Sequence, residues 1–123
     1  MHLPVVAMVA LIGSVGTVQT QMRARQSAKI AELGDALAAT GFHSIDQQAK
    51  ALGLPRSTCW SIRRACHKTS GLSAAIINRI LSTPQLPPLV RICILEYVEE
   101  KIAGLYGHNK RQRHRFVTHL KSI

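Results

Sequence analysis

The chain has 123 residues, about the size of one domain, which excludes a multidomain enzyme with a large substrate cleft. Its hydrophobic fraction of 46% argues against wholesale disorder, and its aromatic fraction of 4% leaves the core to Leu, Ile, Val and Ala. Sixteen Lys and Arg against six Asp and Glu give a formal charge of +10, which favours a polyanionic partner, either nucleic acid or an anionic membrane surface.

Residues 1–21 open with a wholly apolar run, LPVVAMVALI at 3–12, which is too short for a membrane span of about 20 residues. Three interpretations stay open. The segment is an N-terminal extension or a start placed too early, with Met22 as the true start; it is a signal-like or anchoring segment; or it is an ordered helix or strand. We do not expect a membrane partner, and no argument about the fold rests on this segment.

The next residues predict two helices in succession. Residues 22–39 are good helix formers with an apolar stripe at Ile30, Leu33 and Leu37, and Thr40-Gly41 closes this helix. A short helix then begins after Ser44 and ends at Gly53. Its start is marked by the sequence S-x-x-Q, a capping box that Gln47 completes.

Three further helices are predicted, and no segment alternates polar and apolar residues like a strand, so the predicted fold class is all-α. The helices cover residues 55–68, 73–81 and 88–103, with a proline-rich loop before the last. The last one has a wide apolar face that leaves Glu96, Glu99 and Glu100 on its outer side. Residues 108–123 are basic and show no apolar period before Phe116, so we expect a tail. This tail either lies along phosphates as a flexible arm or is disordered.

The acidic and basic residues are unevenly distributed along the chain. Between Gln47 and Leu95 there are seven basic residues and no acidic one, and the C-terminal zone is basic again. Soluble surfaces usually mix both signs, so this pattern favours contact with a polyanion over a merely solvated basic face.

The cysteines and histidines predict neither a disulfide framework nor a metal site. The three Cys include no C-x-x-C pair, and Cys66-His67 with the later histidines fits no zinc spacing, so we expect a reducing, cytoplasmic setting without cofactors. No nucleophile–histidine pattern and no phosphate-binding glycine loop can be read, and carboxylates are scarce. We therefore expect no enzymatic activity and no catalytic residue.

Residues 45–64, IDQQAKALGLPRSTCWSIRR, carry six residue types at a defined spacing. They are a small residue, a turn glycine four positions later, apolar residues on both sides of it, and two candidates for burial in the following helix: Ala49, Gly53, Leu52, Leu54, Cys59 and Ile62. This segment resembles the helix-turn-helix of bacterial and phage transcription regulators. Pro55 departs from the family, which often has a Ser or Thr N-cap there, so it provides no side-chain cap.

The resemblance covers about 20 residues. It implies a trihelical helix-turn-helix core in a DNA-binding domain at residues 22–69, followed by a helical pair at 70–107 and the basic tail. The pair could dimerise through residues 73–105, which we favour slightly, or its apolar face could cover the core of its own monomer. The resemblance identifies no operator and no effector.

In this family the second helix enters the major groove of DNA. If Cys59 and Ile62 face inward, the outward residues are Arg56, Ser57, Trp60, Ser61 and Arg64. We expect Arg56 and Arg64 to pair with guanine, and the two serines to reach a base edge or a phosphate. Trp60 has three readings: contact with a thymine methyl, packing over Arg64, or packing on the first helix.

Further residues are expected at the DNA backbone. Thr58 lies near the start of the second helix, where amides attract phosphate. Lys50, Gln47 and Lys68 would also lie at phosphates, although Gln47 could serve only as a cap. For Arg63, Arg64 and Lys68 the alternative is a solvated cationic helix end.

The function predicted from the sequence is therefore sequence-specific binding of double-stranded DNA by a small prokaryotic transcriptional regulator in the cytoplasm, associated with the nucleoid. Two alternatives remain. A non-specific nucleic-acid-binding protein, of the nucleoid or of RNA, would use the same charge. A membrane-anchored basic protein would use residues 3–18 as its anchor.

Overall fold

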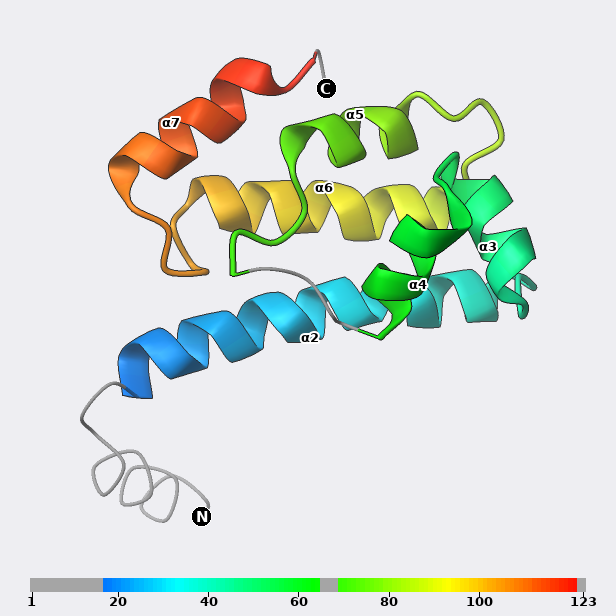
Figure 1. Ribbon diagram of the computed structural model, residues 1–123, viewed down its shortest axis with the longest axis horizontal. Coiled ribbons are helices and arrows are strands. Elements are labelled where there is room, and N and C mark those ends of the chain that lie inside the picture. Colours follow the sequence, from blue (N-terminus) through cyan, green and yellow to red (C-terminus); the bar gives the residue numbers. More distant parts are fainter. Residues whose placement is uncertain (1–16, 65–68, 122–123) are drawn as a thin grey trace.

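The computed structural model describes residues 17–64 and 69–121, and within these ranges the chain forms six helices and no strand (Figure 1). The all-α prediction is therefore confirmed for this part of the chain. In chain order the helices are α2 (Thr17–Ala39), α3 (Ile45–Leu52), α4 (Arg56–Arg63), α5 (Ala74–Leu81), α6 (Pro88–Ile102) and α7 (Lys110–His119).

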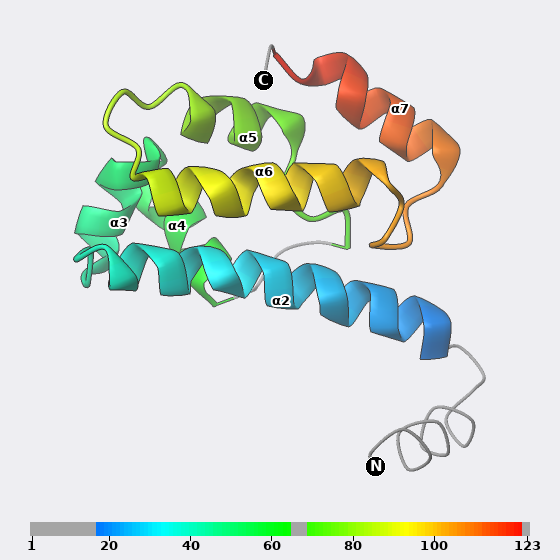
Figure 2. The same cartoon turned by 180° about the vertical axis from the view of Figure 1, so that it is seen from behind.

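The two long helices, α2 and α6, lie side by side, as Figure 1 and Figure 2 both show. α4 packs on α2 and α3 packs on α4 near the C-terminal end of α2, while α5 and α7 pack on α6 and on each other. The buried side chains of all six helices form one hydrophobic cluster. The segments 22–69 and 70–107 therefore share a core in the described part of the molecule.

α2 begins at Thr17, five residues before the predicted start at Met22. Its predicted apolar stripe is buried, because Ile30, Leu33 and Leu37 are at most 2% exposed. The apolar run at 3–12 lies outside the described residues, so its three interpretations stay predictions. In the described ranges, no helix combines the length and the apolar character needed to cross a bilayer.

The apolar face of α6 packs mainly inside the monomer. Val90, Ile94 and Val98 belong to the shared core, whereas Leu89 and Ile92 are exposed. The acidic residues of α6 do not all point outward as expected. The Glu100 carboxylate is half-buried and accepts hydrogen bonds from the Arg25 guanidinium of α2 at 2.9 and 3.1 Å.

The prediction of a tail after residue 107 was wrong for the described residues, because Lys110–His119 form α7. A capping box starts this helix: the Gln112 N–H donates to Asn109 Oδ1 at 2.8 Å, and the Asn109 N–H donates to Gln112 Oε1 at 2.9 Å. Phe116 is 7% exposed and fixes α7 to the core. A buried aromatic residue and a cap thus contribute to the ordering of this strongly basic segment.

The segment of residues 69–72, which precedes α5, is held by buried side chains from α2 and α6. The Gln26 amide donates to the Thr69 carbonyl at 3.0 Å, and the Leu72 N–H donates to the Tyr97 hydroxyl oxygen at 2.9 Å. Lys101 Nζ donates to the carbonyls of Ser70 and Leu72 at 2.6 and 2.8 Å. These bonds give hydrogen-bond partners to the backbone of an irregular segment that is exposed at Thr69 and Ser70 and buried at Leu72.

Candidate nucleic-acid interface

Residues 45–64 form two helices that meet at a turn. The predicted capping box starts α3, because the Gln47 N–H donates to Ser44 Oγ at 3.1 Å and the Ser44 N–H donates to Gln47 Oε1 at 3.3 Å. Gly53 ends α3 with φ +69, in the left-handed region predicted for it. The Gly53 N–H donates to the Lys50 carbonyl at 3.2 Å and the Leu54 N–H to the Ala49 carbonyl at 3.0 Å, the pattern of a Schellman cap.

The side chains predicted to lock this turn lie inside the protein. The five non-glycine residues of the set are all buried: Ala49, Leu52, Leu54, Cys59 and Ile62. Burial raises the pKa of the Cys59 thiol, so it packs as a neutral group. The buried face of α4 therefore determines which side of this helix is exposed.

The turn is also attached to the loop between α5 and α6. Thr83 Oγ1 lies 3.2 Å from the Leu52 carbonyl and 3.0 Å from the Arg79 carbonyl, so this hydroxyl joins the end of α3 to the end of α5. A Cβ at Gly53 would collide with the same Thr83 hydroxyl. Sequence reasoning did not find this contact, because Thr83 lies 30 residues beyond the turn in the chain.

α4 starts after Pro55, which makes no side-chain cap, as the departure from the family pattern predicts. Arg56, the first helical residue, is exposed and forms an ion pair with Asp46 of α3, with 3.3 Å between Nη1 and Oδ1. Both side chains are about 70% exposed, so this pair contributes between about zero and 1 kcal/mol. No pattern in the sequence predicts this pair.

The exposed flank of α4, which we define as Arg56, Trp60 and Arg64, follows a spacing of four residues along the helix. Trp60 is 50% exposed, and the Arg64 guanidinium carbon lies 5.2 Å from the centroid of its ring. Among the three readings of Trp60, the structure shows the packing with Arg64. Both side chains are exposed at the surface.

The remaining predicted residues differ in exposure. Ser57 is exposed, Thr58 and Ser61 are half-buried, and the Ser61 hydroxyl donates to the Ser57 carbonyl at 3.2 Å. On α3, Lys50 and Gln47 are exposed, and the side chain of Gln47 serves the capping box. Arg63 is exposed, while Lys68 lies outside the described residues.

The electrostatic surroundings of α4 are strongly basic. From α3 to α5 Asp46 is the single acidic residue in the sequence, and it pairs with Arg56. Within residues 17–64 and 69–121, no group of three His, Cys, Asp or Glu side chains could hold a metal ion. Cys66 and His67, which the sequence analysis considered, lie outside those ranges.

Comparison with known proteins gives no match: no family model fits the chain, and no curated protein or solved structure is significantly similar to it. The function is therefore argued from the geometry of the candidate interface. The interface presents guanidinium groups on the exposed flank of a short helix, and the opposite face of this helix is packed in the core by buried side chains.

Proposed function

We propose that this chain binds double-stranded DNA in a sequence-specific manner, with α3 and α4 acting as a helix-turn-helix, and that it is a small transcriptional regulator. The observation that carries the proposal is the two-sided character of α4. Cys59 and Ile62 are buried, while the exposed flank presents two guanidinium groups and an indole. Side chains four residues apart project from the same face of a helix, so one groove can receive them together.

The guanidinium groups supply the base recognition. Each can donate two parallel hydrogen bonds to O6 and N7 of guanine, which discriminates against the wrong base by about 1–3 kcal/mol. The Trp60 ring limits the orientations of the Arg64 guanidinium, so less conformational entropy is lost on binding. Arg56 must release Asp46, which costs little because the pair is exposed.

Residues near the flank supply contacts to the phosphates. Ser57 and Thr58 lie in the first turn of α4, where free backbone amides favour an anion. Lys50 and Gln47 are exposed on α3 and would meet the backbone on one side of the groove. Ser61 has a weaker case, because its hydroxyl hydrogen is already given to the Ser57 carbonyl.

A dimer through residues 73–105 is part of the proposal, because a dimer places two such motifs on half-sites that lie one helical turn of DNA apart. Such an interface would cover exposed apolar side chains of this segment, among them Leu89 and Ile92 of α6. Analytical ultracentrifugation of the Ile92→Glu variant with and without DNA tests this part separately.

The test of the function is selection of bound duplexes from a random pool, followed by titration of the selected duplex and a scrambled one. We expect Arg64→Ala to weaken binding to the selected duplex by about tenfold to a hundredfold, because a bidentate base contact is lost. The matched control is Arg111→Ala, an exposed arginine on α7. This substitution should weaken binding to both duplexes by the same factor and reduce the salt dependence of binding.

Two results would overturn the proposal. If the selected and scrambled duplexes bind equally, the chain is a non-specific nucleic-acid-binding protein. If Arg64→Ala and Arg111→Ala lose affinity for the selected duplex by the same factor, α4 does not read bases.

A further inference from the structure

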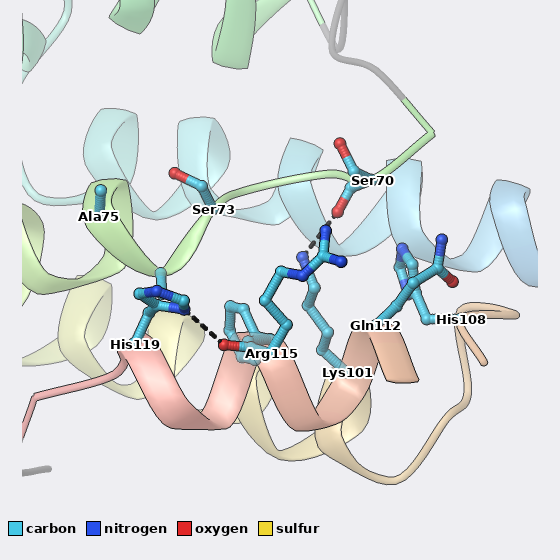
Figure 3. A pocket seen from close by; sticks show the side chains of 10 residues that line it. Ser70, Ser73, Ala75, Lys101, His108, Gln112, Arg115 and His119 are labelled. Carbon is cyan, nitrogen blue, oxygen red and sulfur yellow. Dashed lines mark hydrogen bonds between the residues drawn. The ribbon is translucent and has the colours of Figure 1, made fainter. Parts of the chain in front are cut away.

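An open pocket of about 370 Å³ lies between the start of α5 and α7 (Figure 3), and none of its lining residues belongs to α4. We call it the α5–α7 pocket. The side chains that matter for its chemistry come from four segments of the chain: Ser73, Lys101, His108, Arg115, Phe116 and His119. Its volume is within the range of sites that bind small molecules.

The lining of the α5–α7 pocket carries positive charge without a counterion. Lys101 is 5% exposed, and no described carboxylate forms an ion pair with Lys101 or with Arg115. Both side chains line the pocket, and its lining contains no acidic residue. Uncompensated cations against walls of low dielectric attract an anion strongly.

Lys101 retains hydrogen-bonding capacity for such an anion. An ammonium group has three hydrogens, and two are donated to the carbonyls of Ser70 and Leu72. The Arg115 side chain extends across the mouth of the pocket toward Ser70 in Figure 3. A carboxylate can accept hydrogen bonds from an ammonium and a guanidinium together.

Part of the lining is apolar and suits the body of an organic ligand. Ala74 and Ala75 of α5 and Phe116 of α7 line the pocket, and the Phe116 ring also makes a cation–π contact with Lys101 Nζ, which lies 4.4 Å from the ring centroid. A bare inorganic ion would leave this apolar surface uncovered. The lining therefore favours an anion that carries a ring or a short aliphatic chain.

We propose that the α5–α7 pocket binds a small organic carboxylate, with its charge between Lys101 and Arg115 and its apolar body on Phe116. Such a molecule would contact α5, α6 and α7 together, because residues of all three helices line this pocket. The site is separate from the flank of α4, and its binding is measured without DNA. Failure of either proposal is therefore visible independently of the other.

The experiment is calorimetric titration of the full chain with benzoate, benzamide and inorganic phosphate, supported by thermal denaturation with each compound. We expect saturable binding of benzoate, accompanied by a higher Tm. Benzamide has the same ring without the charge and should bind at least about tenfold more weakly, as should phosphate, which lacks the ring. Ala75→Phe, which fills the pocket, should abolish benzoate binding.

Two variants of α7 assign the charge recognition. Arg115→Gln should weaken benzoate binding by about tenfold, whereas Arg111→Gln, an exposed α7 residue outside the pocket lining, should leave it unchanged. Circular dichroism of both variants checks that they keep their helices. The proposal is overturned if benzoate does not bind, if benzamide or phosphate binds as tightly, or if both variants lose affinity equally.

Discussion

Gly53 and Gly34 show how the same residue type has different roles at two positions. Gly53 joins α3 to α4 at φ +69, and a Cβ there would collide with Thr83. Gly34 lies inside α2, where the nearest atom to an added Cβ is Arg63 Nε at 3.9 Å. A side chain is therefore strained at the first position and accommodated at the second.

We expect Gly53→Ala to lower the free energy of unfolding by about 1–2 kcal/mol or more, because it combines a left-handed backbone with a steric clash. Gly34→Ala is the matched control and should raise stability by up to about 1 kcal/mol, because alanine favours the helix. Urea denaturation measures both. Equal effects of the two substitutions would show that the turn does not require glycine.

Lys101 predicts an unusual dependence of stability on pH. Burial lowers its pKa from 10.5 to about 8. Between these two pKa values the unfolded chain binds a proton that the folded chain does not, so this residue makes the free energy of unfolding rise with pH. Below pH 8 Lys101 is protonated in both states, so the full unfavourable free energy of burying its charge is present. The buried thiols and phenols, whose pKa values are raised, act in the opposite direction at alkaline pH.

The test is therefore the difference in unfolding free energy between the wild type and Lys101→Met, which removes the contributions common to both. From pH 7 to pH 9.5 the wild type should gain roughly 2 kcal/mol relative to the variant. Chemical denaturation at four pH values measures this change. A difference that stays constant across the series would mean that Lys101 keeps its ordinary pKa.

At the scale of the elements, local signals predicted helix ends well. The box at Ser44 and Gln47 and the glycine at Gly53 gave α3 its bounds, because these caps depend on residues three or four apart. α7 was missed because its only buried residue is Phe116, so no apolar period exists. The sequence N-x-x-Q at Asn109 and Gln112 was the signal that could have found it.

The docking of α7 can be tested with trypsin, because this helix contains four of its target residues: Lys110, Arg111, Arg113 and Arg115. A protease must unfold its substrate locally, so the native chain should resist cleavage at these positions. Phe116→Ala removes the buried anchor and should make α7 readily cleaved. Val117→Ala changes an exposed neighbour and serves as the control. Rapid cleavage of the wild type within α7 would contradict its packing.

At the scale of the whole molecule, the long-range contacts could not be read from the sequence. No sequence pattern predicts the burial of Lys101, whose partners are Ser70 and Leu72, about 30 residues away on an irregular segment. The ion pair of Arg25 with Glu100 spans 75 positions. Periodicity and capping rules describe neighbours within a few residues, so they predicted the helices but not this pairing of α2 with α6.

The single shared core predicts that the described parts unfold together. The one Trp of the chain, Trp60, reports on α4, while Tyr97 of α6 stacks on Tyr106 with 5.2 Å between the ring centroids. We expect the fluorescence of Trp60 and the near-ultraviolet circular dichroism of the tyrosines to give the same urea midpoint. Distinct midpoints would instead indicate two independent domains divided near residue 70.

The attachments of α2 to the rest of the molecule differ in how they respond to acid. Arg25 holds the pKa of the Glu100 carboxylate below its usual value, so this pair stabilises the fold at neutral pH and is lost as the pH falls through that lowered pKa. The bond from Gln26 of α2 to the Thr69 carbonyl joins two groups that do not titrate, and Lys101 of α6, which donates to the carbonyls of Ser70 and Leu72, keeps its proton as the pH falls. Acidification would therefore loosen the contact of α2 with α6 on the side of Glu100 and leave residues 69–72 anchored.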